Sequence, residues 1–106
     1  MIIYGIPTCD TCRKARKALA GHDPQWRDIR ALPLSKDEVT EIVAAFGDRA
    51  VNRSSTTWRG LGDDERALSP RDLILKHPTI MKRPVIRSDS GLHLGWGNDV
   101  QAALLP

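Results

Sequence analysis

MIIYGIPTCDTC, residues 1–12, is the stretch of this sequence that decides the fold. Residues 1–5 are mostly β-branched, aromatic or apolar, a pattern that predicts a short buried strand. Residues 6–8 contain a proline and predict a turn. Cys9 and Cys12 follow with C-x-x-C spacing. A C-x-x-C that follows a strand and opens a helix is typical of a redox motif rather than of a zinc site.

The helix that opens at this motif favours an anionic sulfur on Cys9. We expect it to begin near Cys9 or Asp10, to run to about Ala20 and to be capped by Gly21. The first N–H groups of a helix are unpaired and its dipole is positive there. Such a position lowers a cysteine pKa from about 8.5 to between about 3.5 and 7.5. Further positive charge follows in the same helix, from Arg13, Lys14, Arg16 and Lys17.

Cys12 has a different predicted environment from Cys9. It aligns with Ala15, Ala18 and Leu19, which lie three, six and seven positions further along an apolar helix face. We therefore expect Cys12 to be buried and Cys9 to be more exposed, as suits a nucleophile followed by a resolving thiol. The alternative is that both are inert small core residues, as free cysteines often are.

The remaining pattern predicts an α/β fold. The β-α-β order of the first part indicates two parallel strands joined by a helical crossover. A capping box at residues 35–38 begins the clearest helix. The predicted elements after the first helix are a strand at 25–29, a helix from the capping box to Gly47, helical turns within 48–61, a helix at 69–76 ended by His77-Pro78, a hairpin with strands at 84–87 and 92–94, and a final helix with Val100, Ala103 and Leu104 on its apolar face.

This layout is that of a thioredoxin-like fold, a four-stranded mixed sheet with an inserted helical subdomain. We expect one domain over residues 1–106. Residues 1–30 and 78–106 would form the thioredoxin-like core, and the insertion would span about 31–77.

Composition excludes several classes of function. The net charge of +3 favours anionic partners but is too small to argue for DNA binding, and 5% aromatic residues make a base-stacking surface unlikely. No apolar run approaches the ~20 residues of a membrane helix. The N-terminus lacks the features of a signal peptide, so we expect a cytoplasmic protein, in which a structural disulfide is improbable. The three scattered histidines do not complete a zinc site, and we expect no metal.

Three segments resemble a known family. Residues 4–15, YGIPTCDTCRKA, resemble the N-terminal signature of the ArsC/Spx/YffB family. Residues 77–78 together with 82–86, KRPVI, resemble its second signature. Residues 52–59, NRSSTTWR, resemble its middle segment and are closest to the YffB-like subgroup. The resemblance covers essentially the whole chain, and it implies the same thioredoxin-like fold with a helical insertion.

The resemblance also implies roles for individual residues. Cys9 matches the nucleophile of the family's reductases. Arg53 and Arg83 match two arginines that hold an oxyanion and stabilise the thiolate, and Pro84 matches a cis proline close to the cysteine. Cys12 matches the second cysteine of the Spx-type redox switch. From the residues alone, the arginines could be surface residues and the proline an edge-strand residue.

The expected activity is glutathione-linked thiol–disulfide reduction with Cys9 as nucleophile. Trp96 stands where arsenate reductases have a third arginine, and an indole with one N–H cannot replace a guanidinium, so we expect weak or no arsenate reduction. Trp96 could equally be a packing residue. Thr8 and Thr11 could cap the helix or contact the thiolate. The predicted substrate-side residues are Thr8, Thr11, Arg13, Pro84 and Trp96.

Partners follow from the same resemblance. Glutathione is the expected cosubstrate, and glutaredoxin or thioredoxin is a possible reductant. We expect no tightly bound cofactor, and we expect the protein to be a monomer. The alternative is a Spx-like redox-sensing regulator that binds the C-terminal domain of the RNA polymerase α-subunit. This chain is short for that group.

Overall fold

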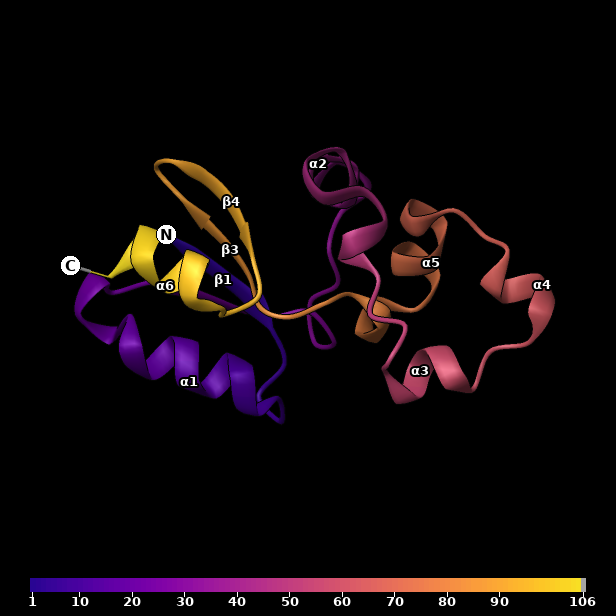
Figure 1. The fold of residues 1–106 in the computed structure, drawn as a ribbon, viewed down its shortest axis with the longest axis horizontal. Coiled ribbons are helices and arrows are strands. Elements are labelled where there is room, and N and C mark those ends of the chain that lie inside the picture. The colour runs from indigo at the N-terminus through magenta and orange to yellow at the C-terminus, as the bar shows by residue number, and fades with distance from the viewer. Residues whose placement is uncertain (106) are drawn as a thin grey trace. The chain divides into compact units, whose positions relative to one another are not determined.

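The computed structural model of the chain describes residues 1–105. The chain divides into two compact units, each considered by itself below (Figure 1). The first unit joins Met1–Leu32 to the chain from Arg83 onward, and the second is Pro33–Lys82. The sequence placed its helical insertion at about 31–77, within two to five residues of the second unit's bounds. The expectation that all residues form one domain stays a prediction.

The first unit is built on a four-stranded mixed sheet. Its strands are β1 (Ile2–Gly5), β2 (Gln25–Asp28), β3 (Val85–Ser88) and β4 (Gly91–Leu94), in the order β2-β1-β3-β4. Strand β1 pairs with β2 in parallel, Ile3 opposite Trp26, whereas β3 is antiparallel to both β1 and β4. The predicted parallel crossover and C-terminal hairpin are both present, and the α/β fold class is confirmed.

Helices α1 (Asp10–Ala18) and α6 (Asn98–Leu104) share one core with the sheet, and Figure 1 shows them close together. Burying each large aliphatic side chain contributes about 1.5–3 kcal/mol, so this core holds α1 against the sheet. It consists of buried side chains from β1, α1, β3 and α6: Ile3, Ala15, Leu19, Ile86, Val100 and Leu104.

Helix α1 differs from the prediction at its C-terminal end. It ends at Ala18, Leu19 is its C-cap, and a 3₁₀ turn, η1 (Ala20–His22), follows in place of a glycine cap. Asp23, with φ of 49°, takes the left-handed conformation expected of Gly21. Ala18 is exposed, because six residues along a helix rotate it about 120° away from the buried stripe of Cys12. Ala103 is also exposed, so Val100 and Leu104 alone form the predicted apolar face of α6.

The second unit is helical. Its capping box is confirmed, since Ser35 Oγ accepts from the Glu38 N–H at 3.1 Å and the Ser35 N–H donates to Glu38 Oε1 at 2.8 Å. Such caps satisfy the unpaired groups of the first helical turn. None of the helices within residues 1–105 is both long and apolar enough to cross a bilayer. The elements are α2 (Lys36–Phe46), η2 (Gly47–Ala50), α3 (Thr56–Arg59), α4 (Asp63–Arg66), α5 (Pro70–Lys76) and η3 (Pro78–Ile80).

Candidate active site

Cys9 is the N-cap residue of α1, where strand β1 passes into the helix through a tight turn. The Cys9 N–H donates to the Ile6 carbonyl at 3.2 Å, and the Cys9 carbonyl accepts from the Arg13 N–H at 3.0 Å. Its side chain is half-buried. The sulfur therefore lies beside the first N–H groups of the helix, as the sequence predicted, while part of it stays accessible to a reactant.

The pKa of Cys9 is lowered from its ordinary value. Partial burial on its own raises this pKa, but hydrogen bonds to the sulfur from the Cys12 backbone, the Cys12 thiol and Arg83 outweigh burial. The positive charge of Arg83 lowers the pKa further. Because a thiolate is the nucleophilic form of cysteine, these groups make Cys9 the reactive sulfur of the pair.

Cys12 is the opposite case, fully buried with 0% of its surface exposed. Burial, the largest cause, raises the pKa of Cys12 to about 12 together with the nearby Cys9, while the Ile6 backbone and Arg83 oppose this rise. At neutral pH Cys12 is therefore a thiol, and it hydrogen-bonds to the Cys9 sulfur. The predicted asymmetry between an accessible and a buried cysteine is present.

Arg83 comes to the site from the segment just before β3, 74 positions along the chain from Cys9. Arg83 is half-buried, and its guanidinium hydrogen-bonds to the Cys9 sulfur. The Arg83–Pro84 peptide bond is cis, and the Pro84 carbonyl accepts from the Gly95 N–H at 2.8 Å. The structure thus brings together Cys9, Cys12 and Arg83 within the first unit.

The other residues predicted near the sulfur are placed differently. Arg13 forms an ion pair with Asp10 at 2.8 Å and donates to the Thr8 carbonyl at 3.4 Å. Arg13 is thus paired with Asp10 one turn away, and its contribution to the charge at the Cys9 sulfur and its substrate-side role stay predictions. Thr8 does not cap α1, since Cys9 occupies the N-cap, and Thr11 is exposed in the first turn.

Arg53 belongs to the second unit, where its guanidinium lies 3.7 Å from Asp48 and 5.1 Å from the centre of the Trp58 ring. Its side chain is 49% exposed. Trp96 is half-buried and packs against the core of the first unit, which is the packing alternative that the sequence left open. The anion-binding role of Arg53 and the substrate-side role of Trp96 stay predictions.

Ile6, whose backbone contacts the Cys12 sulfur, is a residue for which the sequence predicted no role. A contact made by a backbone group does not depend on the residue type, so the sequence cannot predict it. Only the geometry of the turn after β1 shows this contact. Arg83, by contrast, was found by resemblance, because its distance along the chain hides it from any local pattern.

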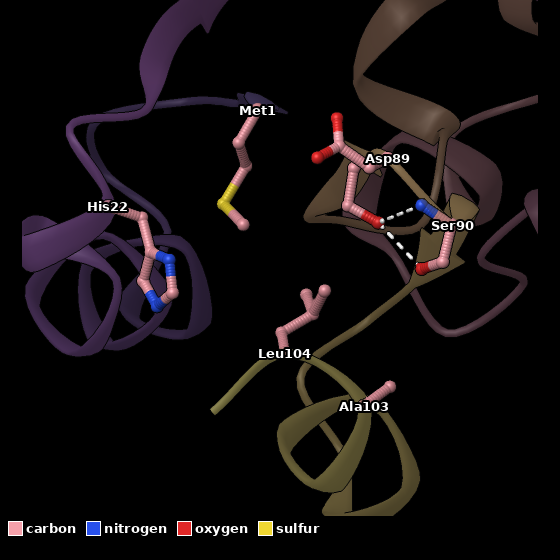
Figure 2. Close-up of a pocket in the computed structure, with 7 residues that line it drawn as sticks. Met1, His22, Asp89, Ser90, Ala103 and Leu104 are labelled. Atoms are coloured by element: carbon pink, nitrogen blue, oxygen red, sulfur yellow. Dashed lines mark hydrogen bonds between the residues drawn. The ribbon is translucent and has the colours of Figure 1, made fainter. Parts of the chain in front are cut away.

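One cavity of about 370 Å³ lies elsewhere in the first unit, where none of the predicted site residues contributes to it. Figure 2 shows the turn of the β3–β4 hairpin, with Asp89 and Ser90, on one side of it and the side chains of Met1 and His22 on the other. Leu104 lies between them at its base. Lacking a thiol or an arginine, this cavity does not match the thiol chemistry assigned to Cys9.

The sequence profile of the ArsC family matches residues 4–104, which span both cysteines, Arg83 and the cis proline. The chain belongs to the ArsC family. The profile covers both units, so the helical insertion is part of what the family shares.

Individual relatives agree with this assignment. The global transcriptional regulator Spx of Listeria innocua is 34% identical over 98% of this chain and 86% of its own. A solved structure of a YffB protein superposes with a TM-score of 0.87, at 31% identity over 99% of this chain and 98% of that one. The solved structure of an arsenate reductase-related protein of Brucella melitensis superposes with a TM-score of 0.73. It is 32% identical over 99% of this chain and 94% of its own. The fold is thioredoxin-like and arsenate reductase-like.

Proposed function

We propose that this ArsC-family protein is a thiol–disulfide oxidoreductase linked to glutathione, with Cys9 as its nucleophile. The family match and the arsenate reductase-like relative support an oxidoreductase. The observation that carries the proposal is the pairing of a half-buried, acidified Cys9 with a buried, protonated Cys12 and with Arg83. That set of groups suits an attacking thiolate, a resolving thiol and a cation for an anionic reactant.

In the first step the Cys9 thiolate attacks one sulfur of a disulfide such as glutathione disulfide. A bond forms between Cys9 and that sulfur, the original sulfur–sulfur bond breaks, and one glutathione leaves as a thiolate that takes up a proton from water. Glutathione carries carboxylates, which a guanidinium can bind with two hydrogen bonds. Arg83 is placed to hold one of them beside Cys9. Arg53 is the second anion-binding candidate, on the family resemblance alone.

In the second step Cys12 resolves the mixed disulfide. Once Cys9 is in a disulfide it has lost its negative charge, so the part of the Cys12 pKa rise that comes from Cys9 disappears, while the lowering effects of Ile6 and Arg83 remain. Cys12 then gives up its proton to the departing glutathione sulfur and forms a disulfide with Cys9. The protein has transferred two electrons to the substrate. A glutaredoxin or thioredoxin dithiol would return the pair to the reduced state, as would two glutathione molecules when the substrate is a disulfide other than glutathione disulfide.

The proposal predicts two covalent species when the reduced protein meets glutathione disulfide. Intact mass spectrometry is expected to show first an adduct of one glutathionyl group on Cys9 and then a species lighter than the reduced protein by two hydrogen atoms. Both should form at neutral pH, because the Cys9 thiolate is stabilised there by Arg83 and Cys12.

Two variants separate the roles of the two sulfurs. Cys9→Ser should give neither species, and Cys12→Ala should stop at the glutathionyl adduct, since no resolving thiol remains. Failure of the wild-type protein to form either species would refute a glutathione-linked activity. Adduct formation on Cys12 in the Cys9→Ser variant would reverse the assignment of the nucleophile.

A regulatory function is the second candidate, because a Spx protein is 34% identical over nearly the whole chain and the C-x-x-C is retained. This reading predicts that the reduced and the Cys9–Cys12 oxidised forms bind the C-terminal domain of the RNA polymerase α-subunit with different affinities. Titration of both forms against the purified domain measures this directly. Equal affinities, or no binding by either form, would exclude a redox switch of this kind.

A further inference from the structure

We propose that Gly5 is the positioning residue for the Cys12 thiol, because its missing side chain is the space that the sulfur occupies. The inference rests on the proposed function, in which Cys12 supports and then resolves Cys9. Gly5 is the last residue of β1 and is buried. A methyl group added at its Cα would lie 2.5 Å from the Cys12 sulfur and 3.3 Å from the Cys12 Cβ. Carbon and sulfur cannot approach so closely without one of them moving.

Space, and not backbone conformation, is what requires glycine at this position. Gly5 is not among the residues with positive φ, so an alanine could adopt its backbone angles. Its carbonyl accepts from the Ile29 N–H at 3.0 Å, and it lies opposite Asp28 in the parallel pair, which are ordinary strand contacts. The backbone of β1 at position 5 would therefore accept a residue with a side chain, but the Cys12 sulfur of α1 leaves no space for one.

The neighbours leave a methyl group no other room. The Trp26 ring would be 3.2 Å from it, and this ring is packed against the core with the Arg16 guanidinium 4.1 Å from its centre. The Cys12 Cβ is fixed by the buried stripe of α1. The atom that can move is the Cys12 sulfur, by rotation to another side-chain rotamer.

That rotation would act on the chemistry of Cys9. In the present rotamer the Cys12 sulfur hydrogen-bonds to Cys9 and lies against the Ile6 backbone. A sulfur turned away from Gly5 would give up these contacts. Gly5→Ala should therefore raise the pKa of Cys9 and slow formation of the Cys9–Cys12 bond by about tenfold to a hundredfold, as misplacement of a reacting atom does.

The test is a double-mutant cycle of wild type, Gly5→Ala, Cys12→Ala and the double variant, with Gly21→Ala as matched control. Gly21 is exposed and has no atom within 4 Å of the added methyl group. The Cys9 pKa is measured from the ultraviolet absorbance of the thiolate, and the resolution rate from stopped-flow mixing with glutathione disulfide. We expect Gly5→Ala to raise the Cys9 pKa when Cys12 is present and to leave it unchanged when Cys12 is replaced by alanine. We expect Gly21→Ala to have no effect on the Cys9 pKa.

Each outcome decides the inference. An unchanged Cys9 pKa and resolution rate in Gly5→Ala, or an equal pKa shift in both backgrounds, would overturn it. If Gly5→Ala does not fold, the double variant should fold, because removal of the sulfur removes the 2.5 Å contact; a double variant that also fails to fold overturns the inference. An ordinary Cys9 pKa in the wild type would refute the proposed function instead, and the thermal stabilities of the same four proteins would still report the contact between Gly5 and Cys12.

Discussion

Replacing Arg83 by alanine is expected to raise the pKa of Cys9 and to slow its reaction with glutathione disulfide at neutral pH. Arg83 provides both a hydrogen bond and a positive charge to the sulfur, so its loss leaves the helix start and Cys12 to oppose the effect of burial. Arg83→Lys should fall between the wild type and Arg83→Ala, because lysine keeps the charge but not the planar fork of donors.

The size of the rate loss follows from two opposing effects. Each unit by which the Cys9 pKa rises above the working pH cuts the thiolate fraction about tenfold. A more basic thiolate is a better nucleophile, which restores about half of that loss on a logarithmic scale. The rate at pH 7 should therefore fall about threefold for each unit of pKa rise. A further loss is expected if Arg83 also holds a glutathione carboxylate, and it would appear as weaker saturation by glutathione disulfide.

Arg13→Ala is the matched control for this prediction. Arg13 is closer to Cys9 in sequence, but it is paired with Asp10, and the lowering of the Cys9 pKa comes chiefly from Cys12 and Arg83. Ultraviolet titration of the Cys9 thiolate should therefore give the wild-type pKa for Arg13→Ala and a raised pKa for Arg83→Ala. A result in which Arg13→Ala shifts the pKa as much as Arg83→Ala would show that the basic helix, and not Arg83, stabilises the thiolate.

The contrast between these arginines shows what local sequence can and cannot predict. The strand, the turn and the start of α1 were predicted from residues 1–12, because periodicity and capping are properties of neighbouring residues. The local sequence predicted that Cys9 lies at a helix start, but Arg83 as the cation beside it was predicted only through the family resemblance. Charge four positions away suggested Arg13, whereas the sheet brings β3 beside β1 and so supplies Arg83.

Packing contacts were predicted least well. Periodicity placed Cys12 on the buried face of α1 but said nothing of what lies against its sulfur. The glycine inside the predicted first strand carried that information, because such a glycine often marks a close approach of other atoms to the backbone. Ala18 and Ala103 were assigned to apolar faces and are exposed. Alanine is small enough to be tolerated on either face, so its identity constrains burial weakly.

Cys12 should make the protein less stable as the pH rises above about 9, and Cys12→Ala should remove that loss. In the folded state burial raises the pKa of Cys12 to about 12, whereas in the unfolded chain it titrates at its ordinary value of about 8.5. Between these values the folded state keeps a proton that the unfolded state has lost. The free energy of unfolding therefore falls as pH rises, by about 1.4 kcal/mol per pH unit, and the stability contributed by Cys12 is fully present only below pH 8.5.

The contribution of Cys9 to the pH dependence of stability has the opposite sign. Its pKa is lowered on folding, so its contribution to stability is present above its ordinary pKa and is lost as the pH falls through the folded value. Above pH 9.5 the Cys9 contribution is nearly constant, because this cysteine is then ionised in both states. The alkaline slope between pH 9.5 and 11.5 therefore isolates Cys12.

Urea denaturation of the reduced wild type and of Cys12→Ala over that pH range measures the slope. The difference between the two free energies of unfolding should change by about 3 kcal/mol across two pH units, whatever stability the alanine variant loses through its cavity. All groups other than Cys12 are common to both proteins, so their contributions cancel in the difference. Parallel pH profiles would mean that the Cys12 thiol does not keep its proton on folding, and that Cys12 cannot donate to Cys9 as the proposed reaction requires.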